Sequence, residues 1–136
     1  MLRRGGALSV AIPLFAVLVA CSTPADSGSD GSDNAGGGTV AVVDGVVLLS
    51  AEDLAFDASV IQAPAGAAFT ISFTNNDSAP HNVSVYTEEG GDQIATSDPV
   101  NEGETLEVEV PAQDAGEYFF VCDIHPDMNG TIVVEG

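Results

Sequence analysis

Short segments in which apolar and polar residues alternate dominate the chain after its first 38 residues. A clear example is FTISF at residues 69–73, where Phe69, Ile71 and Phe73 alternate with Thr70 and Ser72. Side chains of a strand point alternately to its two faces, so this pattern predicts a strand with one buried face. No segment of the sequence shows the period of 3.6 residues that is typical of an amphipathic helix. The sequence therefore predicts an all-β protein.

Turn signals divide this pattern into seven or eight expected strands. Asp44-Gly45 separates two short apolar runs, and Asn75-Asn76-Asp77 ends the strand described above. The expected strands are residues 40–43, 46–49, 55–62, 69–73, 83–86, 106–110, 117–121 and 131–134. Short strands at this spacing predict an antiparallel Greek-key β-sandwich or barrel. Residues 87–103 are expected to form one long irregular surface connection, with room for a single helical turn.

The first 21 residues have the pattern of a secretory signal. Arg3 and Arg4 precede an apolar run at residues 7–20, which is too short for a membrane-spanning helix. The letters LVAC, which end at Cys21, also resemble a bacterial lipobox, the motif at which a lipoprotein signal is cut. We therefore expect residues 1–21 to form a lipoprotein signal that is cut just before Cys21, so that Cys21 becomes the lipid-bearing first residue. An ordinary signal peptide or an uncleaved anchor would leave Cys21 without a role.

Residues 22–38, STPADSGSDGSDNAGGG, consist almost wholly of small and polar residues. They have no apolar periodicity and predict a flexible tether. The remaining residues, 39–136, are enough for one domain. The predicted organisation is therefore a signal, a tether and one folded domain held outside the cytoplasm, lipid-anchored to a prokaryotic membrane or cell surface.

The chain is strongly acidic, with a formal net charge of −19. Its only two cations besides histidine are Arg3 and Arg4, whereas all 21 acidic residues follow Cys21. Nucleic acid and anionic membrane surfaces would repel such a domain, so they are excluded as partners and the membrane is reached only through the lipid. The charge permits a basic protein partner. A salt-rich habitat that selects an acidic, soluble surface would explain the charge equally well. We favour this explanation because the acidic residues are spread along the whole domain.

Cys122 is the only thiol of the mature chain if Cys21 is lipidated, so no disulfide can form within the domain. Three roles are open to it. It could be a buried core residue, a nucleophile or a metal ligand. A nucleophile needs a nearby base or a positive environment, and the domain offers only two histidines for this.

Cys122, His125 and Met128 follow one another at intervals of three residues, and His81 is the only other histidine of the domain. A thiolate, two imidazoles and a weak thioether form the ligand set that characterises blue-copper electron-transfer sites. Zinc prefers four strong donors, and a thioether is a poor one. These four residues therefore predict a copper site.

The sequence also resembles a known family. Residues 75–86, NNDSAPHNVSVY, are similar to plastocyanin, and residues 122–130, CDIHPDMNG, to amicyanin and pseudoazurin, so that most of residues 54–136 resembles a cupredoxin. The resemblance implies one type 1 copper with His81, Cys122 and His125 as equatorial ligands and Met128 as the axial ligand. It implies that Asn82 braces the ligand loop and helps to hydrogen-bond the cysteine sulfur. Gly130 matches the glycine with which the last strand of the family begins.

The resemblance further implies that electrons enter and leave through the exposed edge of His125, inside a mostly apolar patch. Pro80, Ile124, Pro126 and Met128 are the candidates for this patch, and a small apolar contact suits the brief encounters of redox proteins. The expected function is the transfer of single electrons between redox protein partners by a monomer without enzyme activity. The alternative is a copper carrier or buffer outside the cytoplasm that uses the same fold.

The ligand loop contains two acidic residues, whereas the contact surface expected around it is apolar. Asp123 and Asp127 flank His125, and Asp77 lies shortly before His81. Negative charge near the metal favours Cu(II) over Cu(I). We therefore expect that replacing Asp123 and Asp127 together by asparagine raises the reduction potential.

Overall fold

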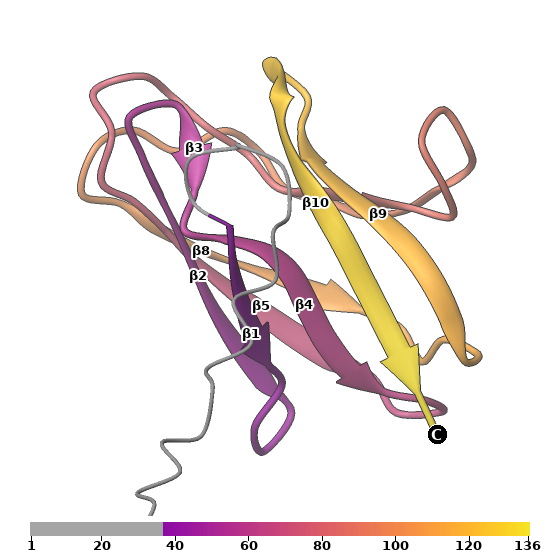
Figure 1. The fold of residues 1–136 in the computed structure, drawn as a ribbon. Helices are drawn as coiled ribbons and strands as arrows, with labels where there is room; N and C mark the ends of the chain where they lie inside the picture. The colour runs from indigo at the N-terminus through magenta and orange to yellow at the C-terminus, as the bar shows by residue number, and fades with distance from the viewer. Residues whose placement is uncertain (1–36) are drawn as a thin grey trace, which may run out of the picture. The chain divides into compact units, whose positions relative to one another are not determined.

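The computed structural model of the chain describes residues 37–136, which form ten strands and no helix. The strands make a sandwich of two sheets and do not close into a barrel (Figure 1). One sheet has six strands in the order β1-β4-β10-β9-β6-β7, and the other has four in the order β3-β2-β5-β8. The prediction of an all-β sandwich is confirmed.

The strands have the following bounds: β1 Gly38–Ala41, β2 Val46–Glu52, β3 Ala55–Phe56, β4 Ala58–Pro64, β5 Phe69–Asn75, β6 Ser84–Tyr86, β7 Gln93–Thr96, β8 Thr105–Val110, β9 Gly116–Cys122 and β10 His125–Glu135.

The sheets are mixed, so the prediction of purely antiparallel pairing is wrong. Strands β1 and β10 are both parallel to β4, and β2 is parallel to β5. The turn predicted at Asp44-Gly45 is present, with positive φ at both residues, as a tight hairpin turn requires. However, only the bridge between Val43 and Val46 joins its two sides, because β1 and β2 then enter different sheets.

The strand count exceeds the prediction for two reasons. The segment expected as one strand at residues 55–62 changes sheets at Asp57, so that β3 pairs with β2 while β4 pairs with β10. Asp57 fixes this crossing, because its backbone amide donates to the Ser50 oxygen and its carboxylate accepts from the Ser50 amide, both at 2.9 Å. In addition, β7 pairs with β6 inside the segment expected to be irregular, where no helical turn forms.

The core lies between the two sheets and follows the predicted alternation. In β5, Phe69, Ile71 and Phe73 are buried and the residues between them are half-buried. Phe56 joins the sheets, because its ring lies 5.8 Å from that of Phe73 in its own sheet and 5.3 Å from that of Phe120 in the opposite sheet. Each such buried side chain stabilises the fold by about 1.5–3 kcal/mol.

The predicted signal of residues 1–21, with Cys21, and nearly all of the predicted tether of residues 22–38 lie outside the described residues. Strand β1 begins at Gly38, where the tether was expected to end. Within residues 37–136, no helix is long and apolar enough to cross a membrane.

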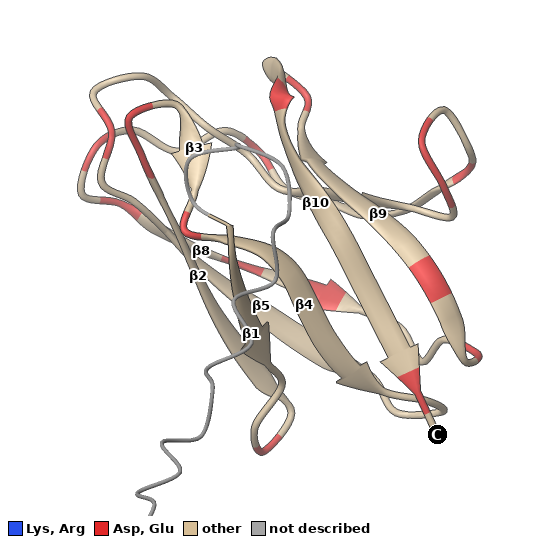
Figure 2. Ribbon diagram, in the orientation of Figure 1, with Lys and Arg blue, Asp and Glu red and all other residues tan. Residues whose placement is uncertain are grey.

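Acidic side chains are spread over turns and strands of both sheets (Figure 2). No lysine or arginine occurs in residues 37–136, so the carboxylates of this part of the chain have no cationic partner other than histidine. Hydrogen bonds from neutral groups must therefore stabilise any carboxylate that the fold partly buries.

Gly130 in β10 tests how closely neighbouring strands of the six-stranded sheet pack beneath the ligand loop. A Cβ atom at this position would lie 2.5 Å from the Ser59 backbone oxygen and in steric overlap with the Phe120 ring. We expect Gly130→Ala to lower the free energy of unfolding by about 1–3 kcal/mol, as overpacking does. Denaturant unfolding of the metal-free protein measures this. Gly136→Ala, whose Cβ would make an ordinary contact of 3.7 Å with Ala65, is the control and should be near neutral.

Candidate metal centre

The centre begins where the ladder between β9 and β10 ends. Cys122, the last residue of β9, pairs with His125, the first residue of β10, across a two-residue turn formed by Asp123 and Ile124. Side chains of directly opposed residues point to the same face of a sheet. The hairpin therefore places the thiol and the imidazole next to each other, with Cys122 Sγ 3.8 Å from His125 Nδ1.

His81 supplies a third donor from the loop between β5 and β6. Its Nδ1 atom lies 3.7 Å from Cys122 Sγ and 3.1 Å from His125 Nδ1, and the two imidazole rings meet edge to face with centroids 4.8 Å apart. His81 and Cys122 are completely buried, whereas His125 is half-buried. The donor atoms of the three predicted equatorial residues thus lie close together, and of the three residues only His125 is partly exposed to solvent.

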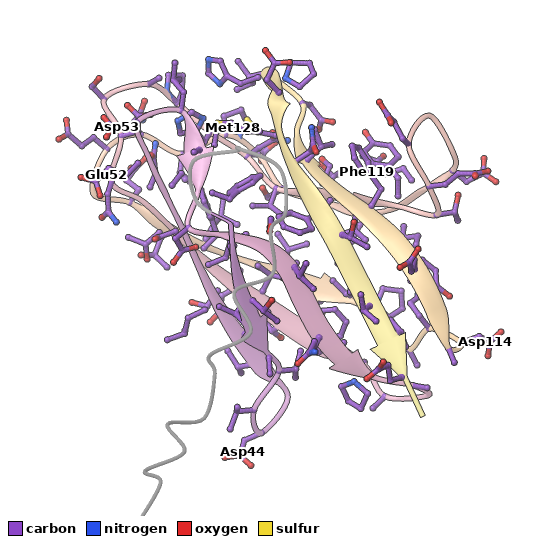
Figure 3. The ribbon with its side chains drawn as sticks, in the orientation of Figure 1. Asp44, Glu52, Asp53, Asp114, Phe119 and Met128 are labelled. Carbon is purple, nitrogen blue, oxygen red and sulfur yellow. The ribbon has the colours of Figure 1, made fainter. Side chains whose placement is uncertain are left out.

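Met128 lies in a bulge of the same hairpin. The ladder skips from the Cys122–His125 pair to Val121 opposite Asn129, so residues 126–128 have no partner in β9. Met128 is 2% exposed and lies at the same end of the sandwich as the turn between β2 and β3 (Figure 3). The four side chains are arranged as a type 1 copper site. Because Met128 is buried, it does not contribute to an exposed patch.

The distances between the donors fit one first-row metal ion. Bonds of about 2.0 Å to nitrogen and about 2.3 Å to sulfur, opened by about 120°, separate a nitrogen from a sulfur by about 3.7 Å. The two measured distances from Cys122 Sγ to the histidine nitrogens are 3.7 and 3.8 Å. The set of one thiolate, two imidazoles and a buried thioether matches copper better than zinc.

A loop after β5 brings His81 to the centre. Asn75, which is completely buried, donates from its side-chain amide to the backbone oxygens of Ala79 at 2.8 Å and Val100 at 2.9 Å. The backbone of His81 also forms a two-bond bridge with Val100. In the sequence Asn75 is recognisable only as a turn signal, because the role of its amide depends on Val100, 25 residues away.

Asp77 contacts the far side of the His81 ring. Its Oδ2 atom lies 3.1 Å from His81 Nε2 and also accepts a hydrogen bond of 2.7 Å from the Leu54 amide. The bond from Leu54, followed by that from His81, lowers the pKa of Asp77 to about 2. The carboxylate is therefore ionised at neutral pH. Its contact with the His81 ring could not be recognised from the sequence, where Asp77 only lies shortly before His81.

Asn82 is joined to the ligand loop by hydrogen bonds. Its side chain is buried and exchanges two hydrogen bonds of 2.9 Å with Asp123, accepting from the Asp123 amide and donating to the carboxylate. In the part of the chain that the structure describes, the polar neighbours of Cys122 Sγ are the two histidines, so the implied contact between Asn82 and the sulfur is not seen.

Two hydroxyl groups also form hydrogen bonds with the Asp123 carboxylate. Ser84 donates to Oδ2 of the carboxylate, and the Tyr86 phenol donates to Oδ1 at 2.9 Å. Partial burial would raise the pKa of Asp123, but the hydrogen bonds from Ser84, Asn82 and Tyr86 outweigh this and lower it. The same contact raises the pKa of Tyr86, with a further contribution from burial. Asp123 is thus a fixed structural carboxylate, in contrast to Asp127.

The residues predicted to form a surface patch are accessible to solvent. Pro80, Ile124 and Pro126 are exposed, with Ile124 at 45%. Asp127 is exposed beside them. The half-buried His125 thus stands in the chain between two exposed apolar residues, Ile124 and Pro126, with the exposed Asp127 next in sequence.

The comparisons with known proteins agree with this fold and site. The sequence model of the family described as "Cupredoxin-like domain" matches residues 11–134, most of the chain, and this chain therefore belongs to the cupredoxin-like family. The match begins inside the predicted signal. The comparison with curated proteins gave no match.

Solved structures show the same architecture. Auracyanin A of Chloroflexus aurantiacus, described as a "blue" copper protein, is 29% identical with a TM-score of 0.58, and the match covers 72% of this chain and 100% of that one. Reduced auracyanin of Roseiflexus castenholzii is 19% identical with a TM-score of 0.59, covering 74% and 100%. A reduced amicyanin variant is 23% identical with a TM-score of 0.53, covering 69% and 86%. The two matches of lower identity show the fold alone.

The hydrogen bond from Tyr86 to Asp123 makes stability depend on pH in the alkaline range. Because this bond raises the pKa of Tyr86, its contribution is fully present below about pH 10, the ordinary phenol pKa, and is lost as the pH rises through the higher folded value. We expect Tyr86→Phe to lower the free energy of unfolding by about 1 kcal/mol at pH 7. The difference from the wild type should shrink above pH 10.

Urea unfolding at several pH values measures this difference. Tyr118→Phe is the control, since that phenol donates to the backbone oxygen of Asp114, away from the ligand loop. A Tyr86→Phe difference that stays constant from pH 7 to beyond pH 10 would contradict the interpretation.

Proposed function

We propose that this protein binds one copper ion at His81, Cys122, His125 and Met128 and carries single electrons between redox partner proteins outside the cytoplasm. The single observation that supports this best is the convergence of the His81, Cys122 and His125 donor atoms, all within 4.8 Å of one another. Copper held there would alternate between Cu(II) and Cu(I). The residues of the chain then have two tasks, to keep one donor geometry for both states and to exclude solvent.

The surroundings of the donors support both tasks. His81 and Cys122 are completely buried, and Met128 is nearly so. His81 is held by its bridge to Val100, and the loop that carries the other donors is held by Asn82. A buried donor set that is fixed by neighbouring hydrogen bonds rearranges little when its charge changes. It also leaves no open position for a substrate, so we propose no catalytic residue and no enzyme activity.

The surface around His125 suits short-lived contacts with redox proteins. Pro80, Ile124 and Pro126 form an exposed apolar surface beside the half-buried ring. Such a small contact fits the low end of interface sizes, where transient electron-transfer complexes lie. The many carboxylates and the absence of lysine and arginine from residues 37–136 permit a basic protein partner and disfavour nucleic acid. We propose that the protein acts as a monomer.

The location of the protein follows from the first 38 residues. We propose that residues 1–21 direct export, that Cys21 carries a lipid and that residues 22–38 tether the domain to the membrane or cell surface. The sequence patterns described above support this arrangement. The domain itself would meet its partners from the end of the tether.

Copper binding can be tested directly on the purified protein. Addition of Cu(II) should produce an intense blue absorption that saturates at one copper per chain, because a thiolate bonded to Cu(II) gives a strong charge-transfer band. Cys122→Ser should abolish this band, whereas Asp127→Asn, an exposed change in the same loop, should retain it. Protein that stays colourless with Cu(II), although correctly folded, would contradict the proposal.

The electron-carrier function can be separated from a copper carrier or buffer by the behaviour of the loaded protein. We expect rapid electron exchange with small redox reagents and slow loss of copper to a competing chelator, because the buried donors obstruct the chelator but not the electron. His125→Gly, which opens the partly exposed corner of the site, should speed copper loss. If the wild type loses copper as fast as it exchanges electrons, the copper-carrier alternative is favoured.

A further inference from the structure

A chain of hydrogen bonds links the turn between β2 and β3 to the buried imidazole of His81. The Leu54 amide and His81 Nε2 both lie within hydrogen-bond distance of the same atom, Asp77 Oδ2, at 2.7 and 3.1 Å. The other carboxylate oxygen is 3.4 Å from the Ala79 amide. A single carboxylate thus connects a surface turn with a candidate metal ligand.

The orientation of the His81 ring defines what the carboxylate does. Its Nδ1 atom faces Cys122 Sγ and His125 Nδ1, at 3.7 and 3.1 Å. A metal bound on that side requires the proton to be on Nε2, which then donates to Asp77. A carboxylate in this position fixes the ring, selects the tautomer and increases the electron donation of the imidazole.

The turn on the other side of Asp77 has an uncommon backbone conformation. Its two central residues, Asp53 and Leu54, have φ values of 52° and 59°. Positive φ is unfavourable for a residue such as leucine, and Leu54 is 54% exposed, so burial of its side chain offsets little of the cost. The hydrogen bond from the Leu54 amide to Asp77 helps to hold the turn in this conformation.

The charge of Asp77 is not neutralised by a cationic side chain. Residues 37–136 contain no lysine or arginine, and the Asp77 side chain is only 12% exposed. Salt screens such a partly buried charge much less than it screens an exposed one. Salt therefore weakens only slightly the electrostatic effect of the Asp77 carboxylate on the His81 imidazole.

We infer that Asp77 is a positioning residue that holds the His81 ring and lowers the reduction potential of the copper site. The inference rests on the proposed copper function. Asp77 acts in two ways, which different substitutions separate. Asn in its place retains an oxygen that can accept from Leu54 and His81 but removes the charge, whereas Ala removes both the charge and the acceptor.

The test measures reduction potentials of the copper-loaded protein by voltammetry. We expect Asp77→Asn to change the ratio of Cu(I) to Cu(II) affinity at least tenfold in favour of Cu(I), which is a rise of about 59 mV for a one-electron couple. The rise should persist at about 1 M salt, where the screening length is about 3 Å. Asp53→Asn, which removes an exposed carboxylate from the same turn, should shift the potential less and only at low salt. Equal shifts for the two variants, or a loss of the Asp77→Asn shift at high salt, would overturn the inference.

A second variant separates the charge from the conformation of the turn. Leu54→Gly retains the backbone amide and removes the unfavourable side chain, so it should leave the potential near that of the wild type. If Leu54→Gly shifts the potential as much as Asp77→Asn, the charge of Asp77 is not the cause. Asp77→Ala should in addition change the position or width of the blue band, because the His81 ring is no longer held.

Failure of the proposed function can be distinguished from failure of this inference. If the wild-type protein forms no blue site, the copper function fails, but the contact can still be observed by NMR of the metal-free protein. The proton on His81 Nε2 should exchange slowly with solvent in the wild type and at least tenfold faster in Asp77→Ala. Equal exchange rates in these two proteins would overturn the role of Asp77 in holding the ring, whether or not copper binds.

Discussion

The pairing of Cys122 with His125 at the end of the β9–β10 ladder is the constraint on which the rest of the centre depends. Opposed residues of an antiparallel pair have their Cβ atoms about 4.5–5.5 Å apart and pointing to the same face. Two donors are therefore adjacent as soon as the hairpin forms. The bulge at residues 126–128 then lets β10 rejoin the ladder at Asn129 and leaves Met128 buried. One local hairpin thus provides three of the four candidate ligands.

The position of the fourth candidate ligand, His81, depends on hydrogen bonds that neutral side chains form with other segments. The amide of Asn75 fixes the loop before it, and Asn82 joins the residue after it to Asp123 in the ligand hairpin. Both asparagines are buried, and for the described residues no buried side-chain nitrogen or oxygen lacks a hydrogen-bond partner. These bonds do not include a metal, so the two halves of the centre are held together by the protein itself. A centre formed in this way can keep one geometry while its charge changes.

Much of this could be predicted from the sequence, because it depends on local patterns or on the chemistry of a few rare residues. The alternation in β5 predicts a buried face wherever the strand lies. Cys122 is the only cysteine of the domain, and His81 and His125 are its only histidines. The change of sheet at Asp57 and the addition of β7 could not be predicted, since each depends on which distant strand is available for pairing. The contact between Tyr86 and Asp123 spans 37 residues and leaves no local signal. Asp123 and Asp127 therefore looked equivalent in the sequence, although only Asp123 is fixed by the fold.

The absence of lysine and arginine from residues 37–136 determines how this fold can hold negative charge near the centre. Asp77 is stabilised by the Leu54 amide and the His81 ring, and Asp123 by an amide and two hydroxyl groups. A hydrogen bond from a neutral donor stabilises a carboxylate without cancelling its charge, whereas a paired arginine would do both. The two carboxylates therefore add their fields at the donor atoms. Their combined field favours the more highly charged state of a bound metal, and Asp77 contributes most in salt because it is the less exposed of the two.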